Sequence, residues 1–151
     1  MKRSGFGLIQ TLLIIILVSG LLVVAMKYAK ITIKQTGDIY AKESAELFMK
    51  SALETSLLAI SGYQRNATNG CLKEINVTSA DDRFFADINI SKYYLLNGSQ
   101  DCNYCGSLCK PISTEESSGM VMLKVHVMTN PKNPKNKNKN ISLYMRTLQK
   151  P

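Results

Sequence analysis

The chain has 151 residues, a formal net charge of +8 at pH 7, four cysteines, one histidine and no tryptophan. About 125 residues remain once an apolar amino-terminal segment is set aside, enough for one small domain and too few for a second. A basic domain of this kind suits nucleic acid, anionic lipid or peptidoglycan as a partner, and scattered solvating lysines explain the same charge.

The apolar segment runs from Phe6 to Met26 and carries no charged side chain over 21 residues. At ~1.5 Å per residue, a helix of this length spans roughly 30 Å, enough to cross the hydrocarbon core of a membrane. A cleavable signal peptide has an apolar core of about 7–15 residues followed by a small-residue cleavage site, whereas this run is longer and ends at Met26-Lys27. We therefore expect a retained, single-pass membrane anchor.

Basic residues flank the anchor on both sides, so their count leaves its orientation ambiguous. Lys2 and Arg3 precede the anchor, and Lys27, Lys30 and Lys34 follow it.

The residues around Gly5 combine a short basic leader, a glycine, a phenylalanine and an apolar run, in the order Lys2-Arg3-Ser4-Gly5-Phe6-Gly7-Leu8-Ile9-Gln10. This stretch resembles the leader junction of the type IV prepilin and pseudopilin family. The resemblance implies a leader of residues 1–5, cleavage after Gly5 by a prepilin peptidase on the cytoplasmic face, and N-methylation of Phe6. It also implies an inner-membrane protein whose residues from about Lys27 onward face the periplasm or the cell exterior.

The same resemblance implies particular partners: other pilins or pseudopilins, an inner-membrane assembly platform and membrane lipid. Most family members have a glutamate as the fifth residue of the processed chain, where this chain has Gln10. In the family that carboxylate is thought to pair with the charged amino terminus of a neighbouring subunit, and a glutamine carries no charge to do so. Gln10 therefore indicates a tip or initiating position in a filament, drift in a minor component, or a protein outside any filament.

The pattern beyond the anchor remains helical, and the predicted helix runs from Phe6 to Ser61 with an amphipathic part over 27–61. One face of that part is apolar: Ala41, Ala45, Phe48, Ala52, Leu53, Leu57 and Ile60. Most of the charged residues Glu43, Glu46, Lys50 and Glu54 fall off this stripe. Gly37 is the weak point of the helix, costing ~1 kcal/mol relative to alanine, and Asp38 is able to cap a restarted helix.

Short runs with strand-like composition follow in residues 62–151. They are Glu74 to Thr78, Phe84 to Ile90, Lys92 to Leu96, Met120 to Met128 and Ile141 to Leu148. The last two alternate apolar and polar residues, which indicates one buried face per strand. We therefore expect an α+β fold, with the long helix packed on a small antiparallel sheet as in pilins.

A lysine- and asparagine-rich segment, residues 130–140, separates the last two predicted strands and is typical of a long hairpin loop. Four of its residues are lysines able to contact phosphates: Lys132, Lys135, Lys137 and Lys139. The family resemblance makes DNA relevant, because DNA-uptake pseudopili bind DNA through basic tip loops. The segment has no aromatic residue for base stacking and no arginine for bidentate contacts, so a solvated loop remains the alternative.

The four cysteines, Cys71, Cys102, Cys105 and Cys109, all follow the anchor. An even number of cysteines in a small exported domain predicts two disulfides, and four cysteines allow three connectivities. We favour a bridge from Cys71 to the 102–109 segment, with the remaining two cysteines closing a small ring. Zinc binding and a thioredoxin-like role are the alternatives, but the paired Cys-x2-Cys signature and a βαβ context are both absent.

Five asparagines begin an Asn-x-Ser/Thr triplet: Asn66, Asn76, Asn89, Asn97 and Asn140. Asn76 and Asn89 also have an acidic residue two places earlier, which resembles the stricter acceptor of bacterial oligosaccharyltransferases. These two are candidate glycosylation sites, with coincidence in an asparagine-rich chain as the alternative.

Residues for catalysis are sparse, and we expect no enzyme, no cofactor and no metal. His126 is the only histidine, and no Ser/His/Asp grouping surrounds it in the sequence. Asp81 and Asp82 precede Arg83 in a turn-like stretch, where a solvated turn is simpler than a catalytic pair. The sequence favours a minor pilin or pseudopilin of a type II secretion, type IV pilus or DNA-uptake machine. The alternative is an adhesin or accessory protein on a permanent signal anchor.

Overall fold

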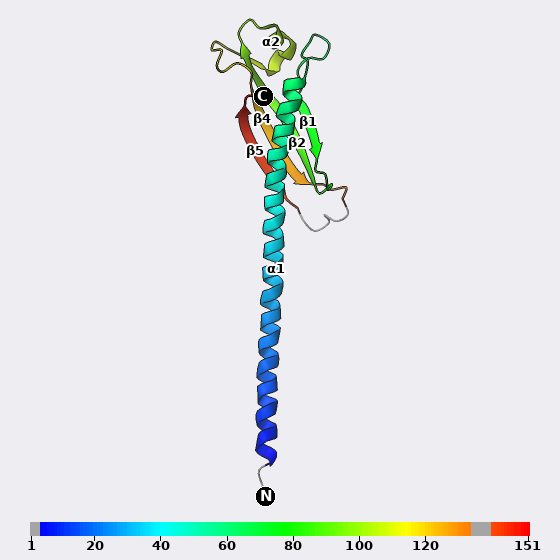
Figure 1. Ribbon diagram of the computed structural model, residues 1–151, viewed down its shortest axis with the longest axis vertical. Helices are drawn as coiled ribbons and strands as arrows, with labels where there is room; N and C mark the ends of the chain where they lie inside the picture. Colours follow the sequence, from blue (N-terminus) through cyan, green and yellow to red (C-terminus); the bar gives the residue numbers. More distant parts are fainter. Residues whose placement is uncertain (1–3, 134–139) are drawn as a thin grey trace. The chain divides into compact units, whose positions relative to one another are not determined.

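The computed structural model describes residues 4–133 and 140–151 of the chain. Its elements are α1 (Ser4–Gly62), β1 (Glu74–Thr78), β2 (Phe84–Leu96), α2 (Gln100–Cys105), the 3-10 turn η1 (Gly106–Leu108), β3 (Cys109–Ile112), β4 (Met120–Thr129) and β5 (Ser142–Gln149) (Figure 1). The chain divides into two units. The first ends at Ala41, and the second, which we call the head, comprises Lys42–Pro151 and holds all five strands.

The described part of the first unit is α-helical throughout. Helix α1 continues through Gly37 and Asp38 without a break. Asp38 therefore does not cap a restarted helix. The hydroxyls of Thr32 and Thr36 bond within the helix, where each donates to the carbonyl four residues earlier at 3.0 Å. One glycine costs only ~1 kcal/mol, which the flanking helical residues offset.

The strands of the head form one sheet in the order β1-β2-β4-β5, with every neighbouring pair on this path antiparallel. Strand β2 is the centre, because it pairs with β4 on one side and with both β1 and β3 on the other. Strand β3 runs parallel to the last residues of β2, from Tyr93 to Leu96. The expected α+β fold is therefore confirmed, with one parallel pair added to an otherwise antiparallel sheet.

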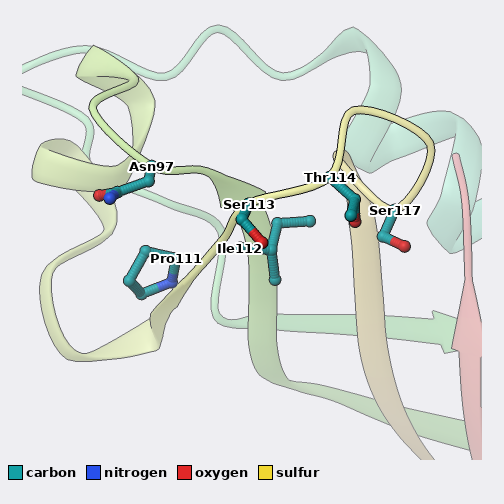
Figure 2. A pocket seen from close by; sticks show the side chains of 6 residues that line it. All are labelled: Asn97, Pro111, Ile112, Ser113, Thr114 and Ser117. Carbon is teal, nitrogen blue, oxygen red and sulfur yellow. The ribbon is translucent and has the colours of Figure 1, made fainter.

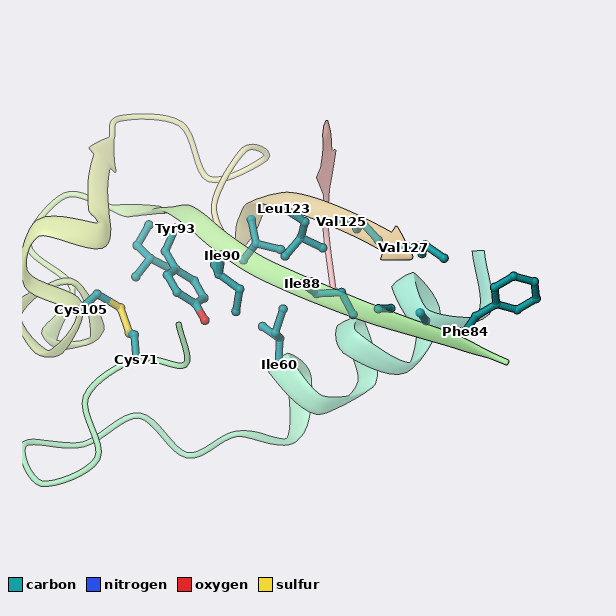
Figure 3. Packing of buried hydrophobic residues seen from close by; sticks show 14 of the residues in the cluster. Ile60, Cys71, Phe84, Ile88, Ile90, Tyr93, Cys105, Leu123, Val125 and Val127 are labelled. Atoms are coloured by element: carbon teal, nitrogen blue, oxygen red, sulfur yellow. A yellow bond between two sulfur atoms is a disulfide. The ribbon is translucent and has the colours of Figure 1, made fainter. Parts of the chain in front are cut away.

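The hydrophobic core of the head lies between the sheet and the last part of α1 (Figure 3). Strand residues Ile88, Ile90, Leu123 and Val125 are fully buried and face Ile60 of the helix. Their neighbours along each strand are more exposed, which is the alternation expected of a sheet with one covered face.

Small residues line the contact between the helix and the sheet. On the helix Ala45, Ala52 and Ser56 are buried, and on β2 Ala86 is buried as well. The Ser56 hydroxyl donates to the Leu53 carbonyl at 2.6 Å, so its burial leaves no polar group unpaired. Larger side chains at these positions would hold the two layers apart and leave voids beside the strand residues.

Strand positions agree closely with the alternation in the sequence, and the predicted strand Glu74 to Thr78 is confirmed. The two predicted runs 84–90 and 92–96 are one strand, β2, with a register irregularity between Ile90 and Lys92. That irregularity reverses the alternation, so Ile90 and Tyr93 are both buried and the pattern resembles two strands. Helix α2 and strand β3 were not predicted, because neither is long enough to show a period.

We expect Ala52→Leu to lower the free energy of unfolding of the head by about 1–3 kcal/mol, because the added carbons have no room between helix and sheet. Chemical denaturation of the full chain in detergent micelles measures this. Ser51→Leu is the matched control: Ser51 is exposed, and the same side chain there should change stability by no more than about 0.5 kcal/mol. Equal effects of the two substitutions would contradict the packing of Ala52 in the core.

Candidate functional site

The amino-terminal part of α1 is apolar on every side. Every residue from Gly7 to Met26 is exposed, and the most apolar 18-residue window has a mean hydropathy of 2.8 with none of it buried. Within the described residues, this is the one helix long and apolar enough to cross a membrane. A helix that is hydrophobic all round needs an apolar environment, and a membrane anchor and a signal sequence both meet that description.

Hydroxyl groups in this apolar segment bond within the helix itself. Thr11 donates to the carbonyl of Leu8 at 2.9 Å, and Ser19 donates to the carbonyl of Ile16 at 2.8 Å. These bonds lower the cost of placing either hydroxyl in hydrocarbon. Gln10 lies on the same helix with its side chain exposed, where a partner from another chain has access to it.

The predicted cleavage junction lies at the start of α1. Gly5 and Phe6 have helical backbones, and the Phe6 side chain falls outside the described part of the structure. Lys2 and Arg3 of the predicted leader lie in residues 1–3, also outside it. Processing at Gly5 therefore remains a prediction from the sequence.

Both disulfides join the chain around α2. Cys71 is bridged to Cys105, and Cys102 is bridged to Cys109 across a sequence separation of 7. This is the favoured arrangement, with Cys71 tied to the 102–109 segment and a small ring closed by the other pair. The first bridge fixes the linker that follows α1 to the last residue of α2, and no cysteine is left free.

An arginine that sequence reasoning did not identify, Arg65, joins the linker after α1 to helix α2. The Arg65 guanidinium forms an ion pair with Asp101 of α2, with Nη1 and Oδ2 3.2 Å apart. It also lies 5.2 Å from the centre of the Tyr93 ring. The linker is thus held to α2 by a charge pair as well as by a covalent bond.

Tyr93 is the largest fully buried side chain of the head. Its hydroxyl donates to the Leu72 carbonyl at 2.8 Å, which satisfies both groups inside the core. Burial raises the pKa of the Tyr93 phenol to about 12, and the nearby Arg65 charge opposes part of that rise.

The first residues of the lysine- and asparagine-rich segment are anchored to the turn before β2. The Asn130 amide donates to Asp82 Oδ1 at 2.6 Å, and the Asn133 amide donates to the Asp82 carbonyl at 3.0 Å. Asp82 has a positive φ of 57°, a conformation that aspartate tolerates better than most residues. Lys132 is exposed beside these contacts. Lys135, Lys137 and Lys139 lie outside the described residues.

Asp81 belongs to the same turn and serves it structurally. Its carboxylate accepts a hydrogen bond from the Ser79 hydroxyl at 2.7 Å and also pairs with the Arg83 guanidinium. The Ser79 hydrogen bond, followed by the Arg83 bond, lowers the pKa of the Asp81 carboxyl to about 2. A carboxylate held ionised in this way is a poor proton donor near neutral pH, which agrees with a structural turn.

The two candidate glycosylation triplets lie side by side on the open face of the sheet. Strands β1 and β2 pair so that Asn76 is opposite Asp87 and Glu74 is opposite Asn89. Each acidic residue is therefore next to the asparagine of the other triplet, and both asparagines are exposed. The pattern of an acidic residue, isoleucine and asparagine occurs once on β1 and once on β2. Pairing of the two strands therefore also explains the pattern, because each acidic residue meets an asparagine across the strands.

His126 lies on the same open face, where its Nε2 is 2.8 Å from the Ser142 hydroxyl oxygen of β5. Among the described residues, no group of three or more histidine, cysteine or acidic side chains is placed to hold a metal ion.

A shallow hollow of about 480 Å³ lies at the other end of the head, beside β3 (Figure 2). It is lined by small polar and apolar side chains: Asn97, Pro111, Ile112, Ser113, Thr114 and Ser117. Hydroxyl and amide groups of this kind suit an uncharged, hydrogen-bonding ligand. They contain no acid, base or nucleophile activated by a neighbour.

Comparisons with protein-family models, with curated proteins and with solved structures found no match.

We expect the head to lose stability as the pH rises from about 10 towards 12, because Tyr93 ionises at about 10 in the unfolded chain and at about 12 in the folded one. Below pH 10 the phenol is neutral in both states, and its full contribution is present. Tyr93→Phe should lower the free energy of unfolding at pH 7 by about 1–3 kcal/mol, since the Leu72 carbonyl loses its donor, and should flatten the alkaline decline.

Chemical denaturation at pH 7 and between pH 9 and 11 measures both effects. Tyr144→Phe is the control, because Tyr144 is 62% exposed. A Tyr93→Phe protein with unchanged stability at pH 7 would show that the bond to Leu72 contributes nothing.

If the lysine segment binds DNA, replacing its four lysines by serine should weaken binding and reduce the slope of log K against log salt by about 3.6. Fluorescence anisotropy with a labelled duplex and the full chain in nonionic detergent measures both. A control variant removes four exposed lysines elsewhere in the head: Lys42, Lys50, Lys73 and Lys124. Equal affinity and slope for the two variants would exclude a specific role for the segment.

Proposed function

We propose that this chain is a minor pilin or pseudopilin, a structural subunit of a type II secretion, type IV pilus or DNA-uptake filament. In this proposal residues 1–5 are removed by a prepilin peptidase, Phe6 becomes the methylated amino terminus, and the head lies in the periplasm. An assembly platform in the inner membrane then moves the subunit from lipid into a filament.

The observation that carries the proposal is that the two parts of α1 have different surroundings. From Gly7 to Met26 the helix is apolar and exposed on all sides, whereas from Ala45 to Ile60 one face belongs to the core of the head. A pilin needs both properties in one helix, because the same segment must reside in lipid and later pack against other helices. The α+β fold and the leader junction are compatible with this reading.

The outer face of α1 within the head supports helix packing between subunits. Leu47 and Leu58 are 67% and 73% exposed and lie three helical turns apart on the face opposite the sheet. Exposed leucines on one stripe of a helix are a typical contact surface for a second helix. Glu54 lies between them on that stripe and would define which neighbours fit.

The proposed mechanism is mechanical. Each leucine, isoleucine, valine or phenylalanine near the bilayer centre favours the membrane by about 0.3–0.6 kcal/mol, so the exposed segment stays in lipid until the platform extracts it. Helix-to-helix packing in the filament then replaces those lipid contacts.

Gln10 supports a minor position, and a tip or initiating role is the most specific form of the proposal. A subunit at the tip lies above its neighbours and has no amino terminus above it to neutralise. An uncharged residue avoids placing an unpaired carboxylate among apolar helices at that point.

The second candidate function is a binding module on a permanent signal anchor, such as an adhesin or accessory protein. The hollow lined by Asn97, Ser113 and Thr114 favours it, because it offers hydrogen-bonding groups to an uncharged ligand. The two candidates differ in whether the chain is cleaved at Gly5.

We expect Gly5→Val to block processing, because a β-branched side chain replaces the residue that precedes the predicted cut. Intact mass measured on membranes from cells that contain a prepilin peptidase should show residues 1–5 absent in the unsubstituted chain and retained in the variant. Gly20→Val is the matched control: an added Cβ there meets nothing within 4 Å, and cleavage should be unchanged.

A chain that keeps its leader in such cells, or a Gly5→Val variant that is cleaved normally, would contradict the proposal. An unprocessed variant with full function would favour the permanent anchor.

A further inference from the structure

The sheet of the head ends in two open edges. Strands β1 and β5 lie at the ends of the path β1-β2-β4-β5, and within the described residues neither has a strand on its outer side. Both pair with their inner neighbours without a register shift. An open edge presents a row of backbone donors and acceptors that another strand is able to use.

One backbone hydrogen bond beside each edge establishes which backbone groups of β1 and β5 point outward from the sheet. The Thr129 N–H donates to the Ile141 carbonyl at 3.1 Å, and the Ile90 N–H donates to the Lys73 carbonyl at 2.8 Å. Backbone groups alternate in direction along an antiparallel strand, so odd-numbered residues of β1 and β5 bond inside the sheet. The even-numbered residues of both strands therefore direct their N–H and C=O groups away from it.

The two edges match when β1 of one molecule is placed antiparallel to β5 of another. Ser142, Tyr144 and Arg146 present outward backbone groups, and they align with Thr78, Asn76 and Glu74 respectively. In this register Leu143 and Met145, which pack against the core, continue the apolar layer formed by Val77 and Ile75. All five residues of β1 find a partner, with apolar residues on the core face and polar residues on the open face.

Charge selects this pairing over the alternatives. Lys124 and Arg146 are exposed and directly opposite each other on β4 and β5, a like-charge pair that destabilises a sheet. Arg146 contacts the Met122 sulfur at 2.7 Å, and neither basic residue belongs to an ion pair among the described residues. When β1 of a second molecule aligns with β5, the exposed Glu74 of that molecule lies opposite Arg146 and supplies a negative charge.

The symmetric alternatives lack this complementarity. An antiparallel β5–β5 pairing centred on Tyr144 would place Arg146 opposite Ser142, and an antiparallel β1–β1 pairing centred on Asn76 would place Glu74 opposite Thr78, so neither places opposite charges across from each other. Only the unlike edges bring opposite charges together.

We propose that the head binds a second copy of this chain by adding its β5 edge to the β1 edge of that copy, with Arg146 opposite Glu74. The contact is heterologous, because each molecule uses a different edge, so it leaves one β1 edge and one β5 edge unpaired in every row. Five residue pairs make a small interface, which membrane anchoring supports by confining the copies to one plane.

The contact is tested with p-benzoyl-phenylalanine at Tyr144, which is 62% exposed on the β5 edge. Two differently tagged full-length chains are expressed together and irradiated in membranes. We expect an adduct that carries both tags and that maps to the tryptic peptide Glu74 to Arg83, which contains Asn76. Within one molecule β2 and β4 separate the two edges by roughly 14 Å, so the mixed tags identify an intermolecular contact.

Charge reversal supplies the second arm. Arg146→Glu and Glu74→Arg should each reduce the adduct about fivefold, and the double variant should restore it. Arg146→Glu also places a carboxylate opposite Lys124, so a lower yield from this variant does not reflect a weakened sheet. The probe at Tyr94, on the same face but on the central strand β2, is the position control and should give little adduct.

Three results would overturn the proposal: no adduct, an adduct with another protein alone, or an adduct that is insensitive to both charge reversals. Crosslinking does not depend on cleavage at Gly5. The pairing of strand edges can therefore fail its test while the proposed function holds, and the proposed function can fail while the pairing holds.

Discussion

The packing of the helix on the sheet is the constraint on which the head depends. Ala45, Ala52 and Ser56 on α1 and Ala86 on β2 are small and buried, and this lets the branched side chains of β2 and β4 fill the space beside the helix. The buried faces of both elements follow from that contact. Because α1 covers only one face of the sheet, the other face and both sheet edges remain available for other roles.

Periodicity in the sequence was sufficient for the main elements of the fold. The intervals of three and four residues from Ala45 to Ile60 correspond to the helix face that packs in the core, and the alternation in β4 corresponds to its buried valines. Helix α2 and strand β3 could not be found in this way, because they are short and are held by disulfides and by contacts with β2. Their structure depends on distant partners, which local composition does not encode.

The candidate sites also differ in how far the sequence predicts them, for the same reason. The long apolar helix was predictable because length and apolarity alone define it. The contacts of Arg65 with Asp101 and of Asn130 with Asp82 were not, since they join residues 36 and 48 positions apart through polar side chains common in any loop. The expected export of the domain and the spacing of the cysteines favoured a bridge from Cys71 to the 102–109 segment. The structure shows that its partner there is Cys105.

The bridge from Cys71 to Cys105 also has a mechanical consequence. A force that draws α1 away from the sheet can extend only the chain between Gly62 and Cys71 before it reaches a covalent stop, roughly 30 Å at full extension. Beyond that point the load passes through Cys105 into helix α2, which follows the central strand β2, and does not pull the edge strand β1 from the sheet. The disulfide therefore acts as a tether that sets how far helix and sheet can separate under tension.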